Sequence, residues 1–179
     1  MPASGQARWG WHRLSPQWAD QIVADAQVSP GDLVVDIGAG TGALTASLVA
    51  AGARVIAVEL HPQRVAMLRE RFVHDRVTVV CADAADLRLP RRPFRVVANP
   101  PFAASTAILR RLLAPGSRLV AGDVVLPHWA GRRWALGNAP GAGRWGRDHA
   151  VGLGRRISRD AFSPRAGTDC VTLVIRRCR

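Results

Sequence analysis

The sequence contains no lysine and no tyrosine, so arginine supplies all 25 of its Lys/Arg-type charges. Against 13 acidic residues this gives a formal net charge of +12. Arginine-only usage can reflect a GC-rich coding sequence. It also suits a nucleic-acid partner, because guanidinium binds phosphate with two donors and stacks on bases.

Cysteine is scarce as well, with Cys81, Cys170 and Cys178 at no CxxC spacing, which excludes a disulfide framework and a cysteine-based zinc site. The five histidines are scattered singly, and we predict no metal. No apolar run reaches the roughly 18 residues of a membrane helix, and the start lacks the apolar core of a signal peptide. We therefore expect a soluble, cytoplasmic protein with reduced thiols.

At 179 residues the chain has the length of one domain. We divide it into a basic and aromatic N-terminal arm at 1–14 and a single domain at 15–179. Arg8 and Arg13 alternate with tryptophan in the arm, a mixture that suits nucleic acid. The alternative for the arm is a disordered terminus with a tryptophan or two packed on the domain.

Positive charge is concentrated near the C-terminus. Residues 1–126 hold 14 Arg and 10 acids, a net of +4, whereas residues 127–179 hold 11 Arg and 3 acids, a net of +8. This asymmetry indicates a polyanion-binding surface, the alternative being a solvated face. The candidate RNA-binding arginines are Arg8, Arg13, Arg132, Arg133, Arg144, Arg147, Arg155 and Arg156.

Apolar runs alternate with helical patterns along the chain. Residues 33–38 form a near-continuous apolar run, which is typical of a parallel strand buried on both faces. Further strands are expected near 53–60, 77–81, 94–98, 118–126, 150–157 and 170–177, with helices between the earlier ones. The pattern predicts an α/β fold with a mostly parallel, doubly wound, seven-stranded sheet and an antiparallel C-terminal hairpin, whose ligand lies at the carboxyl ends of the strands.

A glycine turn follows the first of these strands. Gly38, Gly40 and Gly42 let the backbone approach a ligand at a helix N-terminus, although tight turns use glycine in any case. Glu59 ends the next strand, 21 residues after Gly38, where an acid can bind a ribose diol. Together these features indicate a nucleoside site.

The strand at 94–98 runs into Asn99-Pro100-Pro101-Phe102. Two prolines stop the strand and fix its exit, so the Asn99 amide is held at the edge of the sheet. The Asn99 side-chain oxygen and the Pro100 carbonyl could accept both hydrogens of an exocyclic amine, leaving the lone pair of its nitrogen free. Phe102 could stack on the ring that carries the amine. A plain strand-to-loop turn remains the alternative.

Asp36 and the glycine turn, Glu59, Asp83 and Asn99-Pro100-Pro101-Phe102 together resemble the motifs of class I S-adenosylmethionine-dependent methyltransferases that act on amines. The resemblance implies S-adenosyl-L-methionine as the cofactor. Its expected contacts are His12, Asp36, Gly38, Gly40, Gly42, Glu59, Leu60, Asp83, Ala84 and Asn99.

Within that class the chain is most similar to the erythromycin-resistance ribosomal RNA adenine methyltransferases and the related dimethyladenosine transferases. Asn99 and Phe102 are followed by Ser105-Thr106, and Phe162-Ser163-Pro164 resembles the family's F-x-P segment. The resemblance implies methylation of adenine N6 in 23S ribosomal RNA, which confers macrolide-type resistance. The implied catalytic residues are Asn99, Pro100, Phe102 and Phe162, with the core of the fold as the alternative place for Phe162.

Other activities share parts of this pattern. A dimethyltransferase for 16S ribosomal RNA, a DNA adenine or protein glutamine methyltransferase, and a non-catalytic RNA-binding assembly factor all stay open. The chain also departs from the family. It has Trp11-His12-Arg13-Leu14 where the family has Q-N-F-L, and it has Leu126-Pro127-His128-Trp129 in place of Q-x-E-hydrophobic. It stops at Arg179, after the last strand, so we expect its arginines to hold RNA instead of a helical C-terminal domain. Separately, we expect a monomer.

Overall fold

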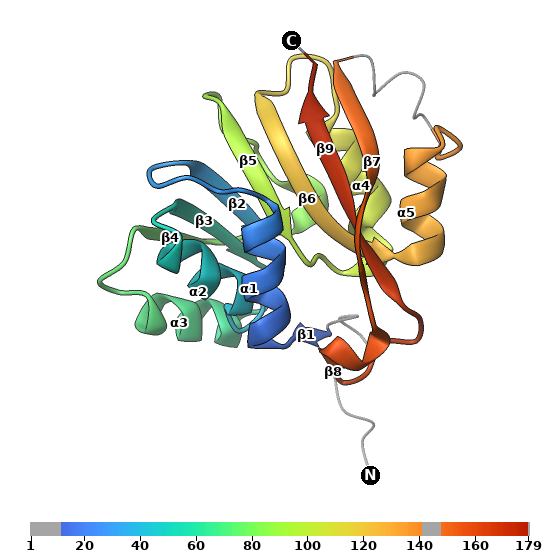
Figure 1. The fold of residues 1–179 in the computed structure, drawn as a ribbon. Coiled ribbons are helices and arrows are strands. Elements are labelled where there is room, and N and C mark those ends of the chain that lie inside the picture. The colour runs from blue at the N-terminus through green and yellow to red at the C-terminus, as the bar shows by residue number, and fades with distance from the viewer. Residues whose placement is uncertain (1–11, 141–147, 179) are drawn as a thin grey trace.

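A seven-stranded sheet in the order β4-β3-β2-β5-β6-β9-β7 forms the centre of the molecule (Figure 1). The structure is a computed structural model that describes residues 12–140 and 148–178. The strands of this sheet are β2 (Leu33–Ile37), β3 (Arg54–Glu59), β4 (Val77–Cys81), β5 (Phe94–Ala98), β6 (Leu119–Pro127), β7 (His149–Ile157) and β9 (Cys170–Arg177). The first five are parallel, and β9 lies antiparallel between β6 and β7. The seven predicted strands and the antiparallel hairpin are therefore confirmed.

Helices pack on both faces of the sheet, as a doubly wound fold requires. The helices are α1 (Pro16–Asp25), α2 (Ala43–Ala50), α3 (Pro62–Arg71), α4 (Ser105–Leu112) and α5 (His128–Ala135). Side chains of α1 and α2 belong to one buried cluster, and those of α4 and α5 belong to another. Both faces of the central strands are thus excluded from water, which explains their continuous apolar sequences.

One expected helix is absent. The connection from β4 to β5 contains only the short 3-10 turn η2 (Ala84–Asp86), so our expectation of a helix between each pair of early strands is wrong there. Pro90 and Pro93 prevent a helix in the second half of this connection, because proline lacks the backbone donor. The Asp83 side chain instead stabilises the turn by accepting the N–H of Ala85 at 2.8 Å.

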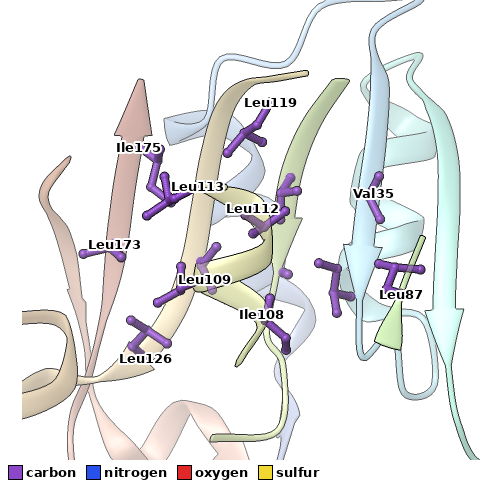
Figure 2. Packing of buried hydrophobic residues seen from close by; sticks show 14 of the residues in the cluster. Val35, Leu87, Ile108, Leu109, Leu112, Leu113, Leu119, Leu126, Leu173 and Ile175 are labelled. Carbon is purple, nitrogen blue, oxygen red and sulfur yellow. The ribbon is translucent and has the colours of Figure 1, made fainter. Parts of the chain in front are cut away.

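The helix α4 packs on the sheet and anchors the segment at 99–102 that precedes it. Its apolar residues Ile108, Leu109 and Leu112 are at most 2% exposed and lie against the β6 and β9 side chains, as Figure 2 shows. Arg110 and Arg111 occupy the opposite side of the helix, which accounts for its amphipathic sequence. The short turn η3 (Phe102–Ala104) leads directly into α4, so the packing of α4 fixes where Phe102 leaves the sheet.

A second, two-stranded sheet joins the two ends of the sequence. Its strands are β1 (Arg13–Leu14) and β8 (Phe162–Ser163), which pair antiparallel with Leu14 opposite Phe162. Leu14 is 2% exposed, so the part of the expected arm that the structure describes packs on the domain. The sequence did not predict this pairing, which brings His12 next to Phe162.

Two absences concern the described residues alone. None of the helices in 12–140 and 148–178 has the length and apolarity to cross a membrane. No group of three or more His, Cys, Asp or Glu side chains in these ranges could hold a metal ion.

Candidate active site

The glycine turn at 38–42, Glu59 and the proline segment at 99–102 lie at the carboxyl ends of β2, β3 and β5, where they meet. These strands are neighbours in the sheet and run parallel, so the turns that follow them share one edge. Gly38 has a φ of +77°, and a Cβ on it would lie 3.0 Å from Pro101 Cδ and 3.2 Å from Pro100 Cα. Glycine is required here because the turn after β2 lies directly against the proline segment after β5.

A hollow lies on each side of Gly38. Of the expected cofactor contacts, one hollow is lined by His12, Asp36, Gly38 and Asn99. The other is lined by Gly38, Glu59, Leu60, Asp83 and Ala84. The two hollows share Gly38, and together they are lined by eight of the ten residues that the sequence assigned to the cofactor.

Two glycines that the sequence assigned to the cofactor, Gly40 and Gly42, line neither hollow. The N–H of Gly40 donates to Glu59 Oε2 at 2.8 Å, so this residue shapes the turn from within. Gly42 is the N-cap of α2 with a φ of +87°, and a Cβ there would lie 2.8 Å from the Phe72 ring and 2.9 Å from Leu68. Gly42 therefore serves the packing of α2 on α3 and lines neither hollow.

The carboxylate of Glu59 is buried at the end of β3. In addition to the Gly40 bond, its Oε1 accepts the N–H groups of Leu60 and His61 at 3.0 and 2.9 Å. A carboxylate offers about four acceptor sites, so three backbone donors leave about one for a ligand hydroxyl. Arg64 Nη1 lies 3.7 Å from the same Oε1. Glu59 thus holds the glycine turn in shape and can still accept from a ribose.

Asp36 lies 1% exposed beneath the glycine turn. Its Oδ2 accepts the hydroxyl of Thr45 at 2.6 Å, whereas its buried Oδ1 has no partner in the described part of the chain. Burial raises the pKa of Asp36 to about 7, and the Thr45 hydrogen bond acts in the opposite direction. An orphan carboxylate oxygen at a hollow fits a cationic ligand group, since a cation would satisfy it and restore the charge.

Asn99 is held in one orientation. Its Nδ2 donates to the backbone carbonyl of His12 at 2.9 Å. No donor in the described residues reaches its Oδ1. The amide therefore has its donor engaged by the protein and its acceptor available, which is the arrangement that recognition of an amine hydrogen requires.

The two predicted aromatic residues both lie close to the His12 ring. The Phe102 ring is half-buried, with its centroid 5.8 Å from that of His12 and an interplanar angle of 26°. Phe162 is 4% exposed, and its ring meets His12 edge-on at 6.5 Å. The structure thus brings Phe102 and Phe162 to the same place, but Phe162 also belongs to the buried cluster under α1 and α2.

At the far end of the second hollow, Asp83 is exposed and uses one side-chain oxygen to cap η2. Its other oxygen has no bond within the described residues. Asp83 and Ala84 lie beyond Glu59, at the end opposite to Asn99, because they follow β4 at the outside of the sheet.

The candidate RNA-binding arginines divide into three groups. Arg8, Arg144 and Arg147 lie outside the described residues. Arg13, Arg132 and Arg133 are exposed, and their side chains make no hydrogen bond or ion pair within the described residues. Arg155 and Arg156 are engaged by acids.

The guanidinium of Arg155 donates to both oxygens of Asp25, and Arg156 donates to Asp169 at 2.9 Å. The hydrogen bond from Arg155 lowers the pKa of Asp25, and the bonds from Arg159 N–H and Arg156 lower the pKa of Asp169. Both aspartates are therefore charged at neutral pH and offset the charges of Arg155 and Arg156. These two arginines are thus less available to a phosphate than the sequence suggested.

Sequence reasoning missed two contributors to this site. Thr45 is fully buried in α2 and is the hydrogen-bond partner of Asp36. A polar residue inside the apolar run of α2 was a detectable signal for it. The carbonyl of His12 was not detectable, because its contact with Asn99 depends on the β1–β8 pairing across the whole domain.

The sequence and the fold are similar to those of known proteins. The family model described as ribosomal RNA adenine dimethylase matches residues 12–146, about three quarters of the chain. Ribosomal RNA small subunit methyltransferase A of Leifsonia xyli subsp. xyli is 37% identical over 172 residues, covering 88% of this chain and 60% of the relative. The mycinamicin-resistance protein MyrB of Micromonospora griseorubida is 35% identical over 161 residues, covering 88% of this chain and 50% of the relative.

The crystal structure of the 23S rRNA methyltransferase ErmE superposes with a TM-score of 0.79 at 23% identity, covering 94% of this chain and 70% of that one. This likeness establishes the fold, including the antiparallel C-terminal strands. The chain spans about half to three fifths of the length of the two curated relatives.

Proposed function

The chain belongs to the ribosomal RNA adenine dimethylase family, and on this premise we propose that it methylates the exocyclic N6 amine of an adenine in ribosomal RNA. The observation that carries the proposal is the orientation of Asn99. Its donor is taken by the His12 carbonyl, so its acceptor Oδ1 is available to an amine at the carboxyl edge of the sheet.

The two hollows around Gly38 fit S-adenosyl-L-methionine. Glu59 has acceptor capacity left for a ribose hydroxyl, and Asp83 with Ala84 lies beyond it, where an adenine would reach. Asp36 borders the hollow beside Asn99, and a cationic amino-acid group bound there would satisfy its unpartnered Oδ1. When bound there, the cofactor supplies an electrophilic methyl group.

The protein's part in the reaction is placement. Asn99 Oδ1 and the Pro100 carbonyl accept the two hydrogens of the adenine amine, which directs the nitrogen lone pair toward the methyl donor. Phe102 stacks on the base, which must be flipped out or unpaired to enter. No side chain has to remove a proton before attack, so most of the rate acceleration comes from orientation.

The RNA backbone would be held by exposed arginines, among them Arg132 and Arg133 on α5. The helix α5 begins directly after β6, whose carboxyl end lies at the same edge of the sheet as that of the neighbouring parallel strand β5. The proposal further comprises a monomer whose residues 15–179 form one domain and which acts in the cytoplasm, where ribosomal RNA is found.

The relatives named above include a small-subunit rRNA methyltransferase and a resistance protein, so the modified RNA can be the 16S or the 23S molecule. We propose 23S ribosomal RNA, as the motif around Phe102 resembles that of the erythromycin-resistance group.

Transfer of tritium from labelled cofactor to protein-free ribosomal RNA, DNA or ribosomal protein tests the proposal. Counts in 23S RNA are expected. Counts only in 16S RNA would favour the assembly role, counts only in DNA or protein would favour the other methyltransferases, and no counts would favour a non-catalytic RNA-binding factor.

A further inference from the structure

The imidazole of His12 lies against the ring of Phe102, on which the proposed function stacks the target base. Its centroid is 5.8 Å from Phe102 and 6.5 Å from Phe162. The first ring is nearly parallel to it at 26° and the second nearly perpendicular at 78°. Both distances lie in the range of attractive aromatic pairs.

The ring is fixed in this place by a side-chain contact. His12 Nδ1 lies 2.9 Å from the carbonyl oxygen of Pro164, which can only accept, so Nδ1 carries the proton. The backbone of His12 is fixed separately. Its carbonyl binds Asn99 Nδ2, and the next two residues pair with β8. The imidazole can therefore turn away about its side-chain torsions while the Asn99 contact stays in place.

We propose that His12 has two separable roles, as a stand-in for the target base and as a positioning residue for Asn99. In the absence of RNA the imidazole, a flat ring like the five-membered ring of a purine, covers Phe102 and Phe162 and keeps water from them. An entering adenine replaces the imidazole on the Phe102 ring. The His12 carbonyl meanwhile keeps Asn99 Oδ1 available to the amine. The inference rests on the proposed function, because it names how that site admits its base.

This assignment differs from the cofactor role that the sequence resemblance implies for His12. A cofactor contact would have the side chain directed at the ligand. Here the ring stacks on Phe102, and its Nδ1 donates to the carbonyl of Pro164, which follows β8. His12 is also one of the residues that line the hollow with Asp36.

A direct test uses 2-aminopurine riboside, an adenine analogue whose fluorescence falls when it stacks. The protein is first saturated with S-adenosylhomocysteine, so that the probe cannot enter the cofactor site. His12→Ala should bind the probe about two- to tenfold more tightly than the wild type, since one aromatic contact no longer has to be broken. His12→Phe, which fills the same space with a ring that is harder to displace, should bind it more weakly.

Adding Phe102→Ala to His12→Ala should abolish the gain, which locates the probe on the Phe102 ring. Unchanged or weaker probe binding by His12→Ala would overturn the stand-in role. So would a loss of cofactor affinity in this variant, which would return His12 to the cofactor site.

Turnover provides the second readout. His12→Ala keeps the backbone carbonyl, so it should lower KM for ribosomal RNA about two- to tenfold with little change in kcat. A purely structural role would lower the thermal midpoint and leave KM unchanged or raised. If the wild type methylates no RNA, the proposed function fails, whereas intact methylation with unchanged KM and unchanged probe binding in His12→Ala overturns the stand-in alone.

Discussion

At the scale of single residues, the site depends on acidic side chains that the fold holds under different constraints. Glu59 accepts three backbone N–H groups and lies close to Arg64, whereas Asp36 is buried with one oxygen unpaired among the described residues. Burial disfavours the charged form of Asp36, whereas Glu59 is the acceptor on which the backbone around it depends. Substitutions at the two positions should therefore have distinguishable effects.

Asp36→Asn should change how stability depends on pH. The folded-state pKa of Asp36 is raised from 3.8 to about 7, so the favourable contribution of the protonated acid is fully present below pH 4 and is lost as pH rises through 7. At 1.36 kcal/mol per pH unit the full difference is about 4 kcal/mol. Urea unfolding of cofactor-free protein at several pH values should show a decline for the wild type, relative to the Asn variant, between pH 4 and 7. Parallel curves would contradict the burial argument.

Glu59→Ala should weaken cofactor binding by about 1.5–3 kcal/mol, through loss of charge-assisted hydrogen bonds to the ribose. It should also lower the thermal midpoint, because the N–H groups of Gly40, Leu60 and His61 lose their acceptor. Calorimetric titration with the cofactor measures the first effect. Glu70→Ala, which removes an exposed acid on α3, is the control and should change neither quantity. Wild-type affinity in Glu59→Ala would show that the ribose is bound elsewhere.

At the scale of elements, the helix α5 and the strand β7 carry four of the eight arginines that the sequence assigned to RNA, but they present them differently. Arg132 and Arg133 project from α5 without partners in the described residues, whereas Arg155 and Arg156 on β7 pair with Asp25 and Asp169. An arginine that is already paired must give up an acid to bind phosphate. The two pairs should therefore contribute unequally to RNA binding.

Replacing Arg132 and Arg133 with Ala should weaken RNA binding at all sequences alike, because interactions with phosphate carry no base information. Removing one arginine–phosphate interaction should flatten the plot of log affinity against log salt by about 0.7–0.9. Replacing Arg155 and Arg156 should change this slope less and lower the free energy of unfolding more. Affinity measured across a salt series for both double variants checks the expectation.

The matched control removes the same charge from the opposite edge of the sheet. Arg54 begins β3 and Arg76 precedes β4, both at the amino ends of parallel strands. Their double alanine variant should leave the slope unchanged. If it flattened the slope as much as the α5 variant, RNA binding would follow net charge and not the position of α5.

At the scale of the whole molecule, the sequence predicted those features that depend on local pattern. The buried strand at 33–37, the glycine turn and the proline segment each carry their signal within a few residues, and parallel topology then brings their ends together. Features that depend on contacts between distant segments were not predictable. The bond from Asn99 to His12 and the pairing of Arg155 with Asp25 require knowledge of which strand edges and helix faces meet.

The proposed function depends on all three scales. The domain holds the target base, the ends of the strands position its amine, and Asn99 accepts a hydrogen bond from that amine. The most direct measurement is mass spectrometry of nucleosides from ribosomal RNA treated with wild-type protein and with Asn99→Ala, alongside the cofactor affinity of each. We predict N6-methylated adenosine from the wild type, a loss of at least about a hundredfold in kcat for Asn99→Ala, and nearly equal cofactor affinities, because Asn99 acts on the amine. Methylation at an atom other than N6, or equal kcat in the two proteins, would contradict this account.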